Sequence, residues 1–244
     1  DYTASPECLS KKPYKGNRRK DMSPAQQAKF QRFMNHLSEF ETLIRKHTTI
    51  ITLVGDKLEA DDLIAGFAQI YGDGDDNEIV IISSDSDLLQ LKRYADVRVI
   101  SPATDKEVTL DHVDNDPELL LFIKCIRGDP TDHVQSACPK ISEAKIRKAY
   151  EDPYERVQLM KRVWKHPHHG EFMVEKLYEE NQKLIDLSKQ PDEIRIQVLQ
   201  TVEEAVNMKR EFSLFHIMKF IGKYELNKIK ENIDQYLPLL SKRS

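Results

Sequence analysis

The sequence predicts an α/β protein with a parallel central sheet flanked by helices and an all-helical lobe toward the C-terminus. Apolar, β-branched runs at residues 48–55, 78–83 and 97–101 alternate with helical stretches, an order typical of parallel sheets. From about Asp111 onward the apolar residues follow a helical period, and no further strand is expected. No apolar run approaches the roughly 20 residues that a membrane span requires.

The helices of the N-terminal half have recognisable starts. Residues 22–47 predict one long amphipathic helix, with Ser23 as N-cap and Pro24 at the first helical position. Residues 59–72 predict a second helix with an apolar inner face, and residues 88–94 a short third one. Each lies between two predicted strands or directly before one, as crossover connections do.

The C-terminal part has five convincing helical segments and further helix toward its end. The segment "KHPHHGEF" between them carries three histidines without partners at ligand spacing, so we expect a solvated loop rather than a zinc site. The predicted helices cover residues 117–128, 141–151, 154–164, 171–187 and 194–206.

Charge is unevenly distributed in a chain of net charge −4. Residues 1–50 hold ten Lys and Arg against five Asp and Glu, whereas residues 55–76 hold seven acids and one lysine. A basic arm beside an acidic pocket suits a metal-dependent enzyme that acts on a polyanion, although solvated surface charge is the alternative for any single run. Three cysteines without metal-type spacing favour a reduced, intracellular setting.

Acidic side chains gather in three short motifs. Asp85 and Asp87 directly follow the predicted strand 78–83, and ligands of open α/β sheets bind at the carboxyl ends of the strands. Glu59 and Asp62 are three residues apart and share a helix face, from which Asp61 is rotated away. The third motif is "GDPTD", with acids at positions 129 and 132.

Each motif has an ordinary structural explanation when it is taken alone. "EADD" is a favourable helix start, "SDSD" after a strand can cap a helix, and "GDPTD" is a turn sequence. Together on one α/β frame they predict a site for two Mg²⁺ ions, because hard divalent ions take oxygen ligands and two of them assist phosphodiester cleavage. Histidine and cysteine ligands that would indicate zinc are absent from these motifs.

Four motifs in order resemble the 5′ nucleases, also called flap endonucleases or 5′→3′ exonucleases, and within them the tailed-phage RNase H branch. They are "YKGNR" at 14–18, "EADD" at 59–62, "SDSD" at 84–87 and "GDPTD" at 128–132. The resemblance implies a PIN-like nuclease domain over residues 1–125, including a basic arch or gateway helix at 11–47. It also implies a helical DNA-binding lobe over residues 126–244, with a start like a helix-hairpin-helix.

The resemblance also implies ligands for the two Mg²⁺ ions, with Mn²⁺ as a substitute. The first ion is expected at Glu59, Asp61 and Asp85, and we keep Asp62 beside Asp61 because the helix-face argument favours it. The second ion is expected at Asp87, Asp129 and Asp132, partly through water. Asp1 lies 13 residues before Tyr14, near the place of another family ligand.

Nucleic-acid contacts follow from the same resemblance. Lys15 and Arg18 are expected to contact the scissile phosphate and its neighbour as catalytic residues, together with Asp85. Tyr14 is expected to stack on a terminal base. The segment after "GDPTD" lacks the glycines of a helix-hairpin-helix, so the resemblance does not carry a K⁺ site over to this sequence. Further contacts to the nucleic-acid backbone are expected from Arg19, Lys140, Lys145, Arg147 and Lys148.

The predicted function is removal of RNA primers and 5′ flaps from duplex DNA during replication, by a monomer inside the cell, in the bacterial cytoplasm if phage-encoded. A single-strand-binding protein or a sliding clamp is a candidate partner, and no membrane is involved. The family's opening strand, with its own aspartate, is not in this sequence, and we expect an N-terminal piece to be missing. A non-catalytic DNA-junction binder and a PIN-type single-stranded RNase therefore remain alternatives, with a phosphatase that uses Asp87 as nucleophile as a weaker one.

Overall fold

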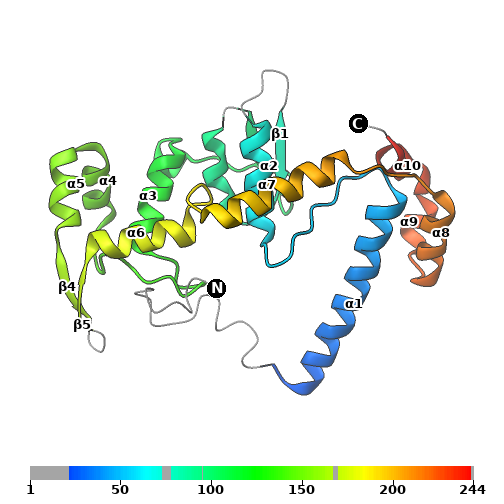
Figure 1. The fold of residues 1–244 in the computed structure, drawn as a ribbon, viewed down its shortest axis with the longest axis horizontal. Helices are drawn as coiled ribbons and strands as arrows, with labels where there is room; N and C mark the ends of the chain where they lie inside the picture. Colours follow the sequence, from blue (N-terminus) through cyan, green and yellow to red (C-terminus); the bar gives the residue numbers. More distant parts are fainter. Residues whose placement is uncertain (1–21, 73–77, 95, 167–169, 243–244) are drawn as a thin grey trace. The chain divides into compact units, whose positions relative to one another are not determined.

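The computed structural model describes residues 22–72, 78–94, 96–166 and 170–242 (Figure 1). These divide into two compact units. The first consists of residues 57–199, and the second of residues 22–56 and 200–242. The boundary predicted between residues 125 and 126 concerns functional domains and stays a prediction.

The first unit contains a small sheet in the order β1-β2-β3. β1 (Ile79–Ile82) and β2 (Val97–Ser101) are parallel, with Ile79 paired to Val97. β3 (Lys106–Glu107) joins the far edge of β2 in the antiparallel direction. The two predicted strands at 78–83 and 97–101 are confirmed as a parallel pair, and the short antiparallel β3 was not predicted.

Helices on both sides of β1 in the chain position the sheet. α2 (Ala60–Tyr71) precedes it and buries Leu63 and Ala68. The connection from β1 to β2 is η2 (Ser86–Arg93), a 3-10 helix where the sequence predicted a short helix. η2 buries Leu88, Leu89 and Leu91 in the main core of the unit, and this packing fixes the start of η2 beside the carboxyl end of β1.

The rest of the first unit is mainly helical. α3 begins with Asp116 as N-cap and Pro117 at its first position, and its apolar residues run through the core of the unit. α3 packs against η2, α4 and α6 (Figure 1). The helices are η3 (Asp111–Val113), α3 (Pro117–Arg127), α4 (Glu143–Glu151), α5 (Pro153–Met160), α6 (Val174–Ile185) and α7 (Asp192–Asn207), of which α7 continues into the second unit.

A β-hairpin interrupts the helices where none was expected. β4 (Val163–His166) pairs with β5 (Gly170–Met173), with Trp164 opposite Phe172. The expectation of helix to Trp164 followed by a loop between helices was wrong. The indole of Trp164 packs 5.4 Å from Phe172 and donates to the Ala137 carbonyl at 2.8 Å, so core packing selects the strand.

The second unit is helical. Ser23 caps α1 (Pro24–His47) in a capping box with Gln26, as the sequence predicted for Ser23. A small core of Leu43, Ile217 and Ile221 joins α1 to α8. The C-terminal helices of the unit are α8 (Leu214–Lys223), α9 (Asn227–Glu231) and α10 (Ile233–Ser241).

The strand predicted at 48–55 does not form. Thr48 has extended backbone angles, but this segment pairs with no strand among the described residues. The backbone N–H of Thr49 instead donates a hydrogen bond to the carbonyl of Leu240 at the end of α10. An apolar, β-branched run favours the extended conformation, but a strand also requires a neighbour to complete its hydrogen bonds.

Among the residues that the structure describes, no helix is long and apolar enough to cross a membrane.

Candidate metal centre

The first part of the site lies where β1 ends and η2 begins. Asp85 is the N-cap of η2, and its carboxylate accepts the Asp87 N–H at 2.9 Å. The Asp85 N–H donates to the Ser83 hydroxyl at 3.0 Å. These local bonds fix the direction of the chain, so that Asp87 projects from the first turn of η2.

The second part is the turn that follows α3. Gly128 has φ 69° and ψ −175°, a combination that is essentially restricted to glycine. A Cβ at this position would lie 2.5 Å from the Val134 carbonyl oxygen. Asp129 and Val134 exchange two backbone hydrogen bonds, of 3.0 and 2.7 Å, and close the turn. The glycine of "GDPTD" is therefore required by the backbone.

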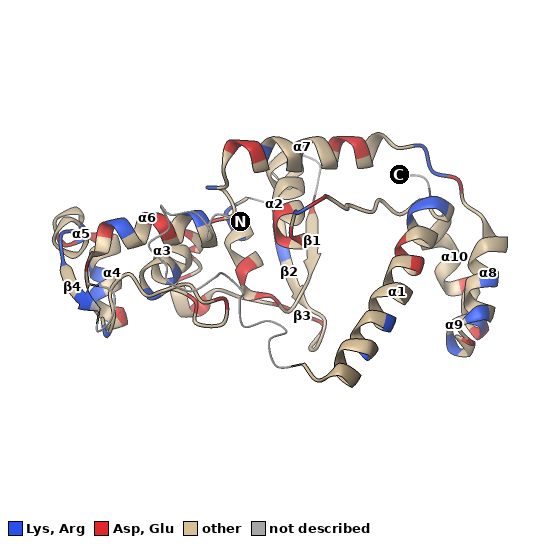
Figure 2. Ribbon diagram, turned by 60° about the horizontal axis from the view of Figure 1, so that its bottom comes forward, with Lys and Arg blue, Asp and Glu red and all other residues tan. Residues whose placement is uncertain are grey.

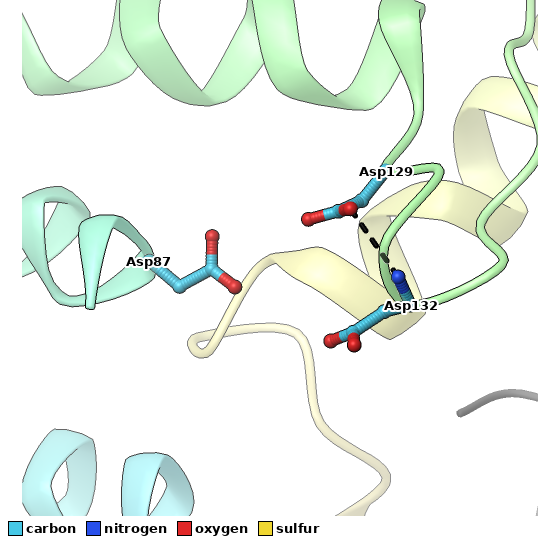
Figure 3. A group of neighbouring side chains, drawn as sticks. All are labelled: Asp87, Asp129 and Asp132. Carbon is cyan, nitrogen blue, oxygen red and sulfur yellow. Dashed lines mark hydrogen bonds between the residues drawn. The ribbon is translucent and has the colours of Figure 1, made fainter. Parts of the chain in front are cut away.

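Asp129 also stabilises the turn with its own side chain. One carboxylate oxygen accepts the backbone N–H of Thr131 at 2.7 Å and that of Asp132 at 3.3 Å (Figure 3). Such bonds are typical of aspartate in turns. They leave the second oxygen of Asp129 directed away from the backbone.

Asn181 on α6 fixes the turn through two hydrogen bonds. Its buried amide donates to the carbonyls of Cys125 and Gln135, both at 2.8 Å. It thereby ties the end of α3 to the segment that closes the turn. Sequence reasoning missed Asn181, and the available signal was an asparagine on the apolar face that Val174, Leu177 and Ile185 define in the predicted helix 171–187.

The two parts bring three carboxylates together. Oxygen atoms of Asp87, Asp129 and Asp132 lie within 4.8 Å of one another, and all three side chains are half-buried. Figure 3 shows Asp87 pointing from η2 toward the two aspartates of the turn. These are the three residues expected at the second ion; their role as ligands stays a prediction.

Lys124 on α3 supplies a cation to this group. Its ammonium forms an ion pair with Asp87 and a hydrogen bond of 3.2 Å with the Ser86 hydroxyl. Three carboxylates and one ammonium carry a net charge of −2 if all are ionised. A set of oxygen ligands with this charge suits a hard divalent cation, and like charges this close favour cation binding. Lys124 was not among the predicted site residues.

The "EADD" acids behave differently. Asp62 accepts the Glu59 N–H at 2.9 Å, and the Glu59 side chain reciprocates in a capping box at the start of α2. Asp62 also accepts a hydrogen bond from the Gln190 amide. Among the described residues, Glu59, Asp61, Asp62 and Asp85 are not members of the carboxylate group formed by Asp87. The structure therefore does not bring together the set expected at the first ion.

Two of the basic side chains that were predicted to contact the nucleic-acid backbone form ion pairs within the protein. Arg147 pairs with Glu143 at 3.2 Å and Asp114 at 2.7 Å, and its hydrogen bond to Glu143 is the main cause of its raised pKa. Lys148 pairs with Glu155 at 2.6 Å, which raises its pKa.

Lys140 and Lys145 are exposed and make no ion pair within the described part of the chain. Figure 2 shows basic residues on α4, α6 and β4. These two lysines are thus more available to an external anion than Arg147 and Lys148. The remaining predicted site residues lie outside the described residues: Asp1, Tyr14, Lys15, Arg18 and Arg19.

Comparison with known proteins gives a family-model match over part of the chain and a fold. Residues 10–117 match the family model of the 5′-3′ exonuclease, N-terminal resolvase-like domain. No curated protein sequence matches the chain.

The matching solved structures include a bacteriophage T5 protein co-crystallised with metal ions, at 20% identity and a TM-score of 0.58, over 79% of this chain and 76% of that one. The bacteriophage T5 flap endonuclease in a complex with DNA and metal ions matches over the same shares, at 20% identity and a TM-score of 0.57. The T5 5′-exonuclease with bound zinc ions matches at 21% identity and 0.57, again over 79% and 76%. The predicted fold class, a PIN-like α/β domain with a helical lobe, is confirmed.

Proposed function

We propose that the protein is a metal-dependent 5′ nuclease, because residues 10–117 match the family model of the 5′-3′ exonuclease N-terminal resolvase-like domain. It hydrolyses phosphodiester bonds in RNA primers or 5′ flaps on duplex DNA. The observation that carries this proposal is the meeting of Asp87 with Asp129 and Asp132, which come from two motifs far apart in the sequence. The similar T5 flap endonuclease has been crystallised with DNA and metal ions.

Asp87, Asp129 and Asp132 would hold Mg²⁺, with Mn²⁺ as a substitute. A bound ion of this kind activates water and stabilises the leaving oxygen of a phosphodiester. The protein's own contribution is to hold the ligands in place. Lys124 orients Asp87 and limits the repulsion among the carboxylates, and the bonds from Thr131 and Asp132 fix Asp129.

A first ion at Glu59, Asp61 and Asp85, with Asp62 and Asp1 as further candidates, is part of the proposal. It rests on the sequence motifs alone. For Glu59 and Asp62 to become ligands, the capping box at the start of α2 has to exchange some of its hydrogen bonds for a cation.

Nucleic-acid contacts in the proposal come from the basic segment around Tyr14, Lys15, Arg18 and Arg19 and from Lys140 and Lys145. Contacts to phosphate and sugar position a duplex without reading its sequence, so binding depends on the structure of the substrate. We further propose a monomer inside the cell, with a single-strand-binding protein or a sliding clamp as candidate partners.

The contribution of the lysines can be measured through the salt dependence of duplex binding. Lys145→Gln removes one exposed cation and should reduce the slope of log K against log salt by about 1. Lys148→Gln is the matched control on the same helix, and its slope should change less because Lys148 is paired with Glu155. Equal effects of the two changes would remove Lys145 from the proposed interface.

The activity is tested with a 5′-labelled flap duplex in Mg²⁺. Cleavage should require the cation, stop when EDTA is added, and be abolished by Asp85→Ala and by Asp87→Asn. Asp105→Asn is a control, because Asp105 is exposed in a turn outside the group and asparagine tolerates its positive φ of 53°. A version of the protein extended at its N-terminus belongs in the same assay.

Three results would change the proposal. Tight flap binding without cleavage by either version would make the protein a junction binder. Cleavage of single-stranded RNA in preference to flaps would favour the PIN-type RNase. Cleavage that survives both Asp85→Ala and Asp87→Asn would contradict the assignment of the site.

A further inference from the structure

A polar cavity lies in the first unit, apart from the carboxylate group. Its volume is about 270 Å³, and it lies between the end of η2 and helices α3, α5 and α6.

 We call this cavity the arginine pocket, after Arg93 and Arg156 in its wall, which Tyr178, Gln182 and Lys189 extend. None of the three carboxylates of the candidate metal centre lines it.

The acids of the arginine pocket are already engaged by one of its arginines. Nε of Arg93 lies 3.2 Å from Glu118, and Nη1 lies 3.6 Å from Asp186. Nη1 also donates to the Ser188 hydroxyl at 3.1 Å. With Arg156 and Lys189 added, three cations face two carboxylates, so the pocket carries a formal charge of +1. The buried Nη2 of Arg93 has no hydrogen-bond partner among the described residues.

The second arginine is held by aromatic rings rather than by acids. The guanidinium carbon of Arg156 lies 4.6 Å from the ring centre of Phe122 and 5.7 Å from that of Tyr150. Within the part of the chain that the structure describes, Arg156 makes no hydrogen bond or ion pair with its side chain. Stacking on aromatic faces orients the guanidinium and leaves its N–H donors available to a ligand.

Further donors line the same cavity. The side chains of Tyr178, Gln182 and Lys189 have no hydrogen-bond partner among the described residues. Burial raises the pKa of Tyr178, so its hydroxyl keeps its proton at neutral pH and can donate. The pocket thus gathers ammonium, guanidinium, amide and hydroxyl donors around an excess of positive charge, which is the chemistry that an oxyanion requires.

We propose that the arginine pocket binds a phosphate group. A phosphate offers several acceptor oxygens to donors from different directions, and guanidinium groups bind it through paired hydrogen bonds. The pocket is smaller than the roughly 300–1,000 Å³ of drug-sized sites, which suits a small anion or the phosphate end of a larger molecule. Inorganic phosphate, a mononucleotide and a nucleic-acid chain share this chemistry. The proposal does not depend on nuclease activity.

The test is calorimetric titration of the whole chain with inorganic phosphate, in EDTA so that no cation at the carboxylate group can recruit the anion. Phosphate should bind, and Arg156→Gln should weaken the binding at least about tenfold. Arg162→Gln is the matched control, because Arg162 is exposed and does not line the pocket. The control should bind phosphate like the unchanged protein.

Lys189→Gln is the second variant, and it keeps the test decisive if Arg156→Gln lowers the melting temperature. Lys189 is exposed, and its loss should weaken phosphate binding by about threefold or more without affecting folding. No phosphate binding, or equal binding by the Arg156, Lys189 and Arg162 variants, would overturn the proposal.

Competition identifies the source of the phosphate. A mononucleotide and two oligonucleotides, with and without a 5′-phosphate, are titrated against bound phosphate. Displacement by both oligonucleotides that Arg156→Gln weakens supports a nucleic-acid backbone, and displacement that requires the 5′-phosphate supports a terminal one. Displacement by the mononucleotide alone supports a small phosphate compound. Displacement that Arg156→Gln leaves unchanged would contradict binding in the pocket.

Discussion

The two acidic regions of the first unit use the same residue types for different purposes. At the start of α2, Glu59 and Asp62 form a capping box and satisfy the helix end. Where η2 faces the turn after α3, Asp87 meets Asp129 and Asp132 across a distance of more than 40 positions in the sequence. The capping box of the first arrangement is complete within four residues, whereas the second arrangement depends on the fold.

This difference shows what makes an acidic cluster a candidate for cation binding. Carboxylates that accept backbone N–H groups at a helix start are already stabilised by hydrogen bonds and the helix dipole. Carboxylates that face one another across two segments repel and are stabilised by a cation. Lys124 supplies one positive charge to the second group, and the remaining negative charge fits a divalent ion.

The largest expected effect is on activity. Asp129→Asn keeps an oxygen that can accept the N–H groups of Thr131 and Asp132, but removes the charge. Flap cleavage should fall at least about 100-fold, while the free energy of unfolding changes by less than about 0.5 kcal/mol. Cleavage rates and urea unfolding measure the two quantities. Retained cleavage would place the reaction elsewhere.

The next largest expected effect is on the free energy of unfolding, through the turn that carries Asp129 and Asp132. Gly128→Ala forces a side chain into a region of φ and ψ that only glycine adopts readily, beside the Val134 carbonyl. We expect a loss of about 2 kcal/mol or more in the free energy of unfolding. Gly222→Ala is the control, because a Cβ there meets no atom within 4 Å and its φ is not positive. A similar loss in both variants would contradict the claim that the backbone conformation at position 128 requires glycine.

Asp62 should matter more for stability than for the geometry of the carboxylate group. Asp62→Ala removes the acceptor for the Glu59 N–H and for the Gln190 amide, so the free energy of unfolding should fall by about 1 kcal/mol. Thermal or urea unfolding measures it. An unchanged stability would mean that the capping box contributes little, and would weaken the contrast between the two regions.

The smallest expected effect concerns Lys124. Lys124→Met keeps the length of the side chain but removes the ammonium that competes for Asp87. Affinity for Mn²⁺ should rise by about threefold, because the carboxylates then lack their internal cation. Calorimetric titration measures the affinity. A weaker affinity would show that Lys124 acts mainly by orienting Asp87.

Much of the fold follows from local patterns in the sequence. The apolar runs that became β1 and β2 indicate a parallel pair, and Ser23 marks the start of α1 correctly. The run at 48–55 has the same composition but lacks a strand beside it among the described residues. The β4–β5 hairpin was missed because its pairing depends on Trp164, whose contacts with Phe172 and Ala137 are tertiary.

The candidate site follows from the sequence only in part. The resemblance to the 5′ nucleases predicts Asp87, Asp129 and Asp132 as neighbours, and the structure brings them together. Lys124 and Asn181 act through partners that are distant in the chain or on another helix, so no local pattern identifies them. Folding decides which polar residues meet, whereas the sequence indicates which residues have suitable chemistry.

The most direct measurement is Mn²⁺ binding by calorimetry to the unchanged protein, to Asp129→Asn and to Asp105→Asn. If the group of Asp87, Asp129 and Asp132 holds the cation, Asp129→Asn should weaken binding at least about tenfold and Asp105→Asn should leave it unchanged. Equal affinities in all three proteins would contradict the proposed metal centre.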